Sequence, residues 1–386
     1  MLLYVIINSG DHMKSLIKMI LQIMRRLDYI CLYLFYRITN KVNTHQILFL
    51  SDSRSDLSGN FYSIYQQVKD EYIVKKHLYS QGQKKESKRI LCKDMAQSRY
   101  ILIDDFYPII YPIPLRKQTK LVQVWHAMGA FKTVGFARKG NHDRFSMTHR
   151  NYDAAIVSSP SIRKDYARAF RMDVNHVYST GIPRTDVFFD NNYIQEKKKE
   201  LYNKYPLLKD KKVILFAPTF RGNNIHNAYY DFNRLDFKHF QEKLKNEYVC
   251  IMKMHPFVKN IDFSQLDSQF YIDLSSEREI NDLLFVTDLL ITDYSSVIFE
   301  ASLLNIKTIF YAYDLEEYIA SRDFFYSYDE YTFGPVVKNQ EELVNAILNS
   351  NIDTEKLKAF KDKFTISCDG HSSQHFVDIV LKEKEL

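Results

Sequence analysis

Glycine and proline are scarce in this chain, with 10 Gly and 9 Pro among 386 residues. That composition leaves no room for a flexible Gly/Ser or Pro-rich linker or for a low-complexity region. No repeat of fixed period is found, which argues against a solenoid or a propeller. Hydrophobic residues make up 46% and charged residues 26%, so the whole chain is expected to fold. Its length predicts two domains of similar size.

Cysteine and long apolar runs are also rare. The four cysteines, at positions 31, 92, 250 and 368, have neither metal-site spacing nor a disulfide pattern, which favours a reducing, cytoplasmic compartment. The uncharged run Tyr29–Tyr36 has eight residues, well below the ~20 that a helix needs to span a bilayer. The first ten residues lack positive charge and no small-residue cleavage site follows, which is unlike a signal peptide.

Positive charge is concentrated in two segments of a chain whose net charge is +6. Residues 1–50 carry six Lys/Arg against two acids, and residues 69–93 carry eight against three. No nucleic-acid-binding motif accompanies them, so nucleic acid is not an expected partner.

Segment 13–42 places basic and polar residues on one helical face and apolar residues on the other: Lys14, Lys18, Gln22 and Arg25 against Ile17, Ile20, Leu21, Met24 and Leu27. This pattern predicts a helix lying on an anionic membrane surface; a helix packed into the first domain is the alternative.

Short apolar runs alternate with helical segments along both halves of the chain. Strands are predicted at 47–50, 100–103, 120–125, 154–158 and 176–180, and again at 213–217, 249–254, 289–292 and 308–313. Strands separated by helices form parallel sheets. We therefore predict an α/β protein of two Rossmann-like domains facing a central cleft, at 46–190 and 191–386, after a membrane-associating segment at 1–45. A final helix near 372–384 could cross back to brace the first domain.

Three apolar runs of the second half are followed by groups that bind phosphate. These groups are Pro218, Thr219 and Arg221 after 213–217, His255 after 249–254, and Asp293, Ser295 and Ser296 after 289–292. A guanidinium, an imidazole, hydroxyls and helix N-terminal amides all neutralise or donate to a diphosphate. Ligands of doubly wound sheets bind at the carboxyl ends of the strands, so an anionic site is predicted there. The alternatives are a surface salt bridge for Arg221 and a helix cap for the serines.

His126 ends the predicted strand 120–125 and precedes a small Gly-containing turn. An imidazole at that position can accept a proton from a hydroxyl near neutral pH. The alternative is a structural histidine packed beside Trp125. The chain contains no Asp-x-Asp sequence, the usual carboxylate clip for a metal-bound nucleotide sugar. We therefore expect no metal site and a mechanism that relies on fixed cationic and amide donors.

Seven motifs in this order resemble the CDP-glycerol glycerophosphotransferases, a family that includes the ribitol-phosphate transferases of wall teichoic acid and capsule assembly. They are VWHAMGAFKTVGF (124–136), TGIPRTD (180–186), LFAPTFRG (215–222), KMHP (253–256), TDYSSVIFEASLL (292–304), FYAYDLEEY (310–318) and DGHSSQHFVD (369–378). The resemblance runs from about residue 100 to the C-terminus. It is weaker before that point, where the loop SDSRSDLSGN (51–60) is the similar part.

The resemblance implies a GT-B-like fold on the cytoplasmic face of the membrane and no obligatory cofactor. The implied reaction moves glycerol phosphate or ribitol phosphate from a CDP-polyol to a hydroxyl of a lipid-linked, undecaprenyl-diphosphate-type acceptor, with release of CMP. It assigns His126 and His255 to catalysis, and the donor diphosphate to Arg221, Thr219, His255, Ser295 and Ser296. Pro218, Asp293 and Glu300 match motif positions near the donor nucleotide without a settled role.

Two other functions compete with this one. A GT-B sugar transferase would use a UDP- or CMP-sugar with the same architecture. A non-catalytic scaffold would hold an anionic polymer at the membrane through basic residues. Neither the polyol, nor the distinction between a primase and a polymerase, nor the oligomeric state follows from the sequence.

Overall fold

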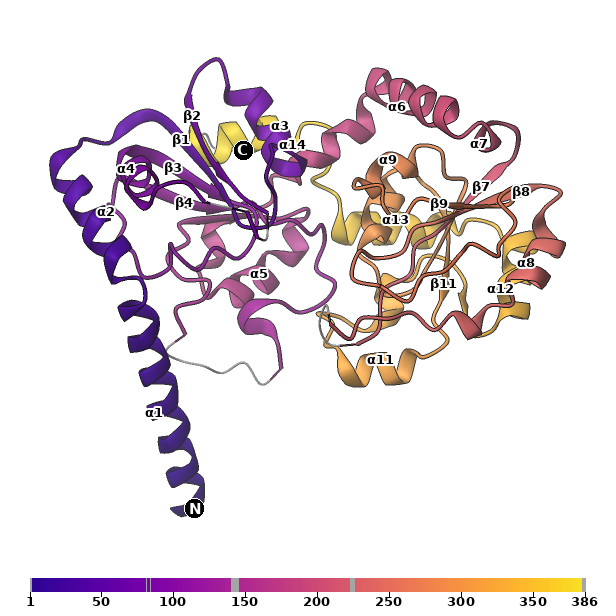
Figure 1. Ribbon diagram of the computed structural model, residues 1–386, viewed down its shortest axis with the longest axis horizontal. Coiled ribbons are helices and arrows are strands. Elements are labelled where there is room, and N and C mark those ends of the chain that lie inside the picture. The colour runs from indigo at the N-terminus through magenta and orange to yellow at the C-terminus, as the bar shows by residue number, and fades with distance from the viewer. Residues whose placement is uncertain (1, 81, 84, 140–145, 223–225, 384–386) are drawn as a thin grey trace. The chain divides into compact units, whose positions relative to one another are not determined.

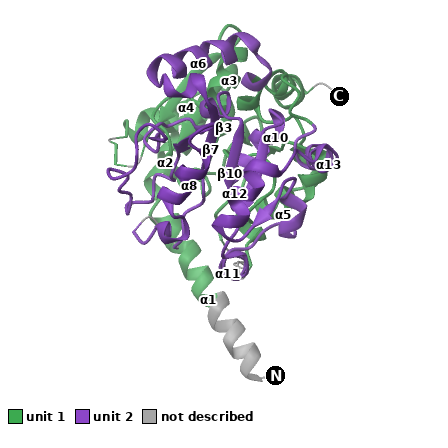
Figure 2. Ribbon diagram, turned by 90° about the vertical axis from the view of Figure 1, so that its right-hand side faces the viewer, with its two compact units in different colours: residues 1–186, 367–386 green, residues 187–366 purple. Residues whose placement is uncertain are grey.

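A computed structural model describes residues 2–80, 82–83, 85–139, 146–222 and 226–383, with side chains from residue 13 onward. Residue 1 of the predicted segment 1–45 and residues 384–386 of the predicted domain 191–386 lie outside this range. The chain forms two compact units (Figure 2). Unit 1 comprises residues 1–186 and 367–386, and unit 2 comprises residues 187–366.

Unit 1 is built on a parallel sheet with the strand order β2-β1-β3-β4-β5-β6. Its strands are β1 (Asn43–Ser51), β2 (Ile73–Leu78), β3 (Ser98–Ile103), β4 (Lys120–Gln123), β5 (Ala154–Ile156) and β6 (Val177–Tyr178). Its helices are α1 (Leu2–Met24), α2 (Leu27–Thr39), α3 (Gly59–Val68), α4 (Lys88–Gln97), α5 (Arg163–Phe170) and α14 (Ser372–His375), which continues as a π-helical turn at Phe376–Leu381. The continuous apolar runs of β1 and β3 place them in the buried centre of the sheet.

The C-terminal segment completes the core of unit 1. Phe376 and Val380 pack with Ile47 and Phe49 of β1 in one buried cluster, and the segment lies beside α3 (Figure 1). The carboxylate of Asp186 accepts hydrogen bonds from the first two backbone N–H groups of α14 at 2.8 Å. An acid at that end of a helix satisfies donors that have no partner within the helix.

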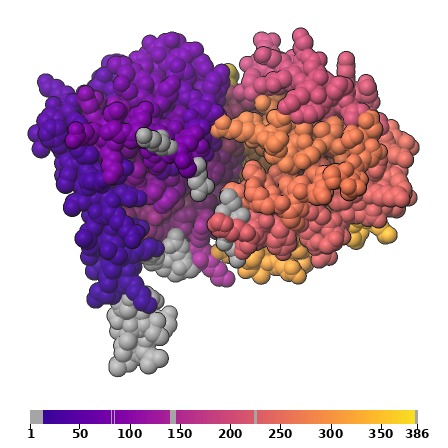
Figure 3. All heavy atoms as spheres, viewed as in Figure 1, coloured from indigo at the N-terminus to yellow at the C-terminus, as the bar shows by residue number. Residues whose placement is uncertain are grey.

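Helix α1 projects from unit 1 (Figure 1), and many of its described side chains, from residue 13 onward, lie on the surface (Figure 3). Helix α2 is fixed to the body of the unit, because Tyr33 is fully buried and its hydroxyl accepts the N–H of Arg116 at 3.1 Å. Large apolar side chains are exposed along α1 and the start of α2: Met13, Ile17, Ile20, Leu21, Met24 and Leu27. Within the described part of the chain, no helix is both long and apolar enough to span a bilayer.

Unit 2 contains a second parallel sheet with the strand order β12-β11-β10-β7-β8-β9. Its strands are β7 (Lys212–Phe216), β8 (Tyr248–Met252), β9 (Tyr271–Asp273), β10 (Leu289–Thr292), β11 (Lys307–Tyr311) and β12 (Val336–Val337). Its helices are α6 (Asn191–Lys204), α7 (Leu207–Asp210), α8 (Phe237–Leu244), α9 (Ile280–Leu284), α10 (Val297–Leu303), α11 (Leu315–Ser321), α12 (Gln340–Asn349) and α13 (Thr354–Phe364). Since β10, β7 and β8 are parallel neighbours, their carboxyl ends meet at one edge.

Candidate active site

A left-handed residue sets the position of His126 in unit 1. Strand β4 ends at Gln123, two residues earlier than the sequence predicted, because Trp125 adopts φ 49°. The Trp125 N–H donates to Gln123 Oε1 at 2.9 Å, and its carbonyl accepts from Asn60 Nδ2 at 2.8 Å. A bulky residue in this conformation stores strain of about 1–3 kcal/mol, which these contacts hold in place.

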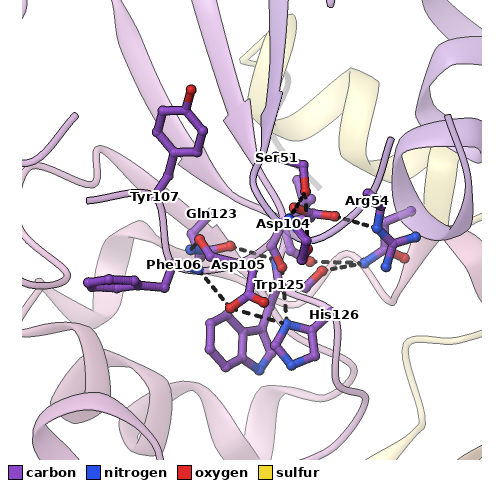
Figure 4. Close-up of polar contacts among 12 residues, drawn as sticks. Ser51, Arg54, Asp104, Asp105, Phe106, Tyr107, Gln123, Trp125 and His126 are labelled. Atoms are coloured by element: carbon purple, nitrogen blue, oxygen red, sulfur yellow. Dashed lines mark hydrogen bonds and ion pairs between the residues drawn. The ribbon is translucent and has the colours of Figure 1, made fainter. Parts of the chain in front are cut away.

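The imidazole of His126 has a defined tautomer. Its Nδ1 lies 3.2 Å from the backbone carbonyl of Asp104 (Figure 4). A carbonyl oxygen can only accept, so Nδ1 carries the proton and Nε2 keeps its lone pair. Asp105 Oδ1 lies 3.8 Å from the same Nδ1, and the His126 side chain is 42% exposed. The ring can therefore accept a proton at Nε2, and the Asp105 carboxylate stabilises the cation that results.

Three residues that the sequence motifs did not single out help to hold His126 in place: Asp104, Arg54 and Arg184. Asp104 is 2% exposed, and its Oδ2 lies 2.7 Å from Nε of Arg54. Burial raises the pKa of Asp104, and the Arg54 guanidinium and the Ser51 hydroxyl partly offset this shift. Arg184 donates to the carbonyl of His126. The available sequence signal was positional: Asp104 and Asp105 directly follow the apolar run of β3.

In unit 2, Asp293 joins the ends of β7 and β10. The residue is 1% exposed. Its Oδ1 accepts the N–H of Thr219 at 2.7 Å and that of Tyr294 at 2.5 Å, while Oδ2 accepts from Arg221 Nη1 at 3.0 Å. Both oxygens of its carboxylate therefore accept hydrogen bonds from the protein, and these bonds connect the two strand ends.

The guanidinium of Arg221 is enclosed by protein groups. It is 8% exposed and forms a two-point contact with Asp314 beyond β11, with Nε–Oδ2 2.6 Å and Nη2–Oδ1 2.8 Å. Its Nη1 also donates to the carbonyl of Thr219 at 2.6 Å. Four tyrosine rings lie within 5.1–5.8 Å of it: Tyr230, Tyr294, Tyr313 and Tyr318. Arg221 therefore positions the ends of β7, β10 and β11.

His255, after β8, has the opposite tautomer to His126. Its Nδ1 accepts the N–H of Phe257 at 3.1 Å, so the proton of the neutral ring lies on Nε2. The ring packs against Phe220 and Phe257, with centroids at 4.7 and 4.6 Å. These contacts fix the orientation of the Nε2–H donor. The neutral ring of His126 thus has its lone pair on Nε2, and that of His255 has its proton there.

Ser295 and Ser296 follow Asp293 at the end of β10 and are half-buried. The side chain of Ser296 makes no cap hydrogen bond to α10, and Ser295 Oγ accepts from Val297 N–H at a long 3.4 Å. Capping of α10 is therefore a weak explanation for two serines at this position. The helix has seven residues, so its dipole is small.

The other predicted donor-site residues lie inside unit 2. Pro218, Thr219 and Glu300 are buried. Thr219, Arg221 and Asp293 contact one another directly, whereas His255, Ser295 and Ser296 are partly exposed after neighbouring strands. Among the described residues, no group of three or more His, Cys, Asp or Glu could hold a metal ion.

Comparison with known proteins places the chain in a family. The family model described as CDP-Glycerol:Poly(glycerophosphate) glycerophosphotransferase matches residues 32–382. The chain belongs to this glycerophosphotransferase family. The resemblance drawn from the motifs is thereby confirmed.

Two relatives within the family are named for ribitol phosphate. The chain is 45% identical to the teichoic acid poly(ribitol-phosphate) polymerase of Bacillus spizizenii over 89% of its own length, but it spans only 57% of that protein. It is 35% identical to the teichoic acid ribitol-phosphate primase of the same organism, over 87% of this chain and 91% of the relative.

A solved structure shows the same fold. The wall teichoic acid polymerase TagF superimposes with a TM-score of 0.75 at 24% identity, covering 97% of this chain and 98% of that one. Together with the two parallel sheets, this match confirms the GT-B-like α/β class predicted for the glycerophosphotransferase chain.

Proposed function

We propose that this protein transfers a polyol phosphate from a CDP-activated donor to a hydroxyl of a lipid-linked acceptor in teichoic acid or capsule polymer synthesis. The observation that carries the proposal is the 35% identity to a ribitol-phosphate primase along nearly the full length of both chains. The two histidines with opposite tautomers, placed after strands of parallel sheets, support it chemically.

The reaction assigns one role to each histidine. The acceptor hydroxyl attacks the phosphorus that carries the polyol and gives its proton to Nε2 of His126. The bond from that phosphorus to the bridging oxygen breaks, and CMP leaves with the electron pair. His255 donates its Nε2–H to the departing phosphate. Phosphoryl transfer depends mainly on positioning and charge stabilisation, which fixed donors of this kind provide.

The hydroxyls of Ser295 and Ser296 supply further donors to the diphosphate. Arg221, Asp293 and the N–H of Thr219 form the support beneath them, in which the guanidinium acts as a positioning group. Pro218, just after β7, and Glu300, in α10, are buried and belong to the same support.

Ribitol phosphate is the group that we propose is transferred. Both relatives described above are named for it, and one makes polymers whereas the other is a primase. The acceptor is proposed to be of the undecaprenyl-diphosphate type.

We place the enzyme on the cytoplasmic face of the membrane, bound peripherally through α1. The exposed apolar side chains of α1, from Met13 to Met24, support this placement. The exposed Lys14 and Lys18 on the same helix would contact anionic lipid.

Product analysis tests the function. Purified protein is offered CDP-ribitol, CDP-glycerol or a UDP-sugar together with a lipid-linked acceptor, and nucleotide release and product mass are measured. CMP release with CDP-ribitol and a mass gain of one or more ribitol phosphates are expected. UDP release from the sugar nucleotide would identify a glycosyltransferase instead. Salt-sensitive polymer binding without nucleotide release would identify a scaffold.

A further inference from the structure

A cavity of about 240 Å³ lies in unit 1 between the end of α1 and the segment that follows β3. Its volume corresponds to roughly eight water molecules, which is room for a diphosphate. Its polar and aromatic lining includes Gln22, Arg25, Arg26, Phe106, Tyr111 and Thr148, and among the described residues that line it there is no Asp or Glu.

Arg26 brings a positive charge to the wall of this cavity. Its Nε atom is buried and has no hydrogen-bond partner among the described residues. Because this atom is closed off from water-sized molecules, an anion in the cavity would not bond to it directly; its charge would instead offset the cost of burying part of the guanidinium. Arg25 beside it is exposed and adds a second positive charge to the same lining.

The cavity adjoins the segment after β3, which contacts His126. Phe106 lines it and directly follows Asp105, whose carboxylate lies 3.8 Å from the His126 ring. The Phe106 ring points away from that of His126 (Figure 4). The cavity and the imidazole therefore flank the same short segment.

A chain of hydrogen bonds also connects the cavity wall to the end of β4, which precedes His126. The hydroxyl of Tyr111 lies 2.9 Å from that of Tyr152, which accepts from Gln123 Nε2 at 3.1 Å. Gln123 Oε1 in turn accepts the N–H of Trp125, the residue before His126. The position of the cavity wall is thus tied to the position of the proposed base.

We propose that this cavity binds the diphosphate of the lipid-linked acceptor. Its location at the end of the amphipathic helix lets the prenyl chain follow the exposed apolar residues Ile20, Leu21 and Met24, while the polar part of the acceptor extends toward His126. Arg26 and Arg25 neutralise the diphosphate. This inference rests on the proposed function and names the acceptor's binding site.

Binding of geranyl diphosphate tests the site without requiring turnover. Calorimetric titrations compare the full-length protein with Arg26→Gln, Arg25→Gln and Lys18→Gln, using geraniol as the neutral probe. Lys18 is an exposed residue of α1 outside the cavity lining and is the matched control for charge. We expect geranyl diphosphate to bind the wild type and Lys18→Gln equally, and at least tenfold more weakly to each arginine variant. Geraniol should show no such difference.

Vesicles separate a prenyl diphosphate from bulk anionic lipid as the source of the anion. Sedimentation with phosphatidylglycerol vesicles should fall to the same small extent in Arg26→Gln and Lys18→Gln, because each removes one positive charge from the same region of the chain. Unchanged geranyl diphosphate affinity in both arginine variants would overturn the proposal. So would a loss confined to phosphatidylglycerol vesicles.

The two proposals fail differently. A wild type that releases no CMP, yet binds geranyl diphosphate through Arg26, would contradict the proposed function alone. An active wild type whose arginine variants bind geranyl diphosphate normally would contradict the acceptor site alone.

Discussion

Arg221 and Asp314 meet in a two-point contact, with Nε–Oδ2 2.6 Å and Nη2–Oδ1 2.8 Å, although 93 positions separate them. The planar fork of a guanidinium matches a carboxylate in this way, and a lysine does not reproduce it. The contact links the ends of β7 and β11, and Asp293 connects both to β10.

Removal of this guanidinium should destabilise unit 2. Because Arg221→Ala leaves the buried carboxylate of Asp293 and the half-buried one of Asp314 without their partner, we expect the free energy of unfolding to fall by roughly 3–5 kcal/mol, as seen when buried ion pairs are broken. The matched control is Arg234→Ala, which breaks an exposed pair with Asp231 and should change stability by less than about 1 kcal/mol. Urea unfolding followed by circular dichroism measures both. Equal effects in the two variants would contradict the assigned role.

The proton-accepting role of His126 predicts that no neutral amide can replace it. His126→Ala and His126→Gln should each lower the rate of CMP release about 100- to 1,000-fold with the fold intact. His45→Ala, at an exposed histidine of unit 1, should leave the rate unchanged. Near-wild-type CMP release from either His126 variant would refute the assignment.

His255 should behave differently, because its Nε2 is a donor. A glutamine amide also presents an N–H group, so His255→Gln should retain part of the rate that His255→Ala loses, again about 100-fold or more. His239→Ala, at an exposed histidine of unit 2, is the control. The measurement is the initial rate of CMP release at saturating acceptor. Identical losses in the Ala and Gln variants would mean that donation is not its role.

The serines after β10 should affect donor use and not stability. We expect Ser295→Ala with Ser296→Ala to lower kcat/KM for the CDP-polyol about 100-fold, since two hydroxyl donors to the diphosphate are lost. The melting temperature should stay within a few degrees, because Ser296 makes no side-chain cap bond to α10. Ser276→Ala, at an exposed serine, should change neither quantity. A large drop in melting temperature with normal donor kinetics would assign the serines to folding instead.

His149 should make unit 1 sensitive to mild acid. Burial lowers its pKa to about 4, against an opposing influence of Asp105, while the unfolded chain keeps the ordinary value of 6.5. Between these values the unfolded chain binds more protons, so stability falls as the pH falls. The loss between pH 7 and pH 5 should be roughly 2 kcal/mol.

A variant without the titrating group identifies the source of that loss. His149→Phe keeps an aromatic ring beside Trp125 and Phe170, which His149 contacts at centroid distances of 6.1 and 5.1 Å. The measured quantity is the unfolding free energy of both proteins at pH 7 and pH 5. A variant with the same pH dependence as the wild type would show that another group is responsible.

The strands that could be predicted from the sequence are those whose apolar runs are continuous. The runs at β1, β7, β8 and β10 are buried on both faces, and each was recognised. Strand β2 was not predicted, because it lies at the sheet edge and contains Lys75 and Lys76. The three-residue β9 and two-residue β12 were too short to produce a pattern.

The sequence predicted which residues belong to the candidate site, but not which of them contact one another. Strand-end positions singled out His126, His255 and the serine pair. The enclosure of Arg221 depends on Asp314, which is distant in sequence and carries no local signal. The left-handed conformation of Trp125 could not be predicted either, because tryptophan has no preference for positive φ.

The return of residues 367–383 to unit 1 has a consequence for biosynthesis. Unit 2 is continuous in sequence, whereas the core of unit 1 includes Phe376 and Val380. Domains fold as units while the ribosome adds about 5–20 residues per second. Unit 2 can therefore reach its final form first, and the nascent sheet of unit 1 must wait, with apolar surface uncovered, until the last helical segment emerges.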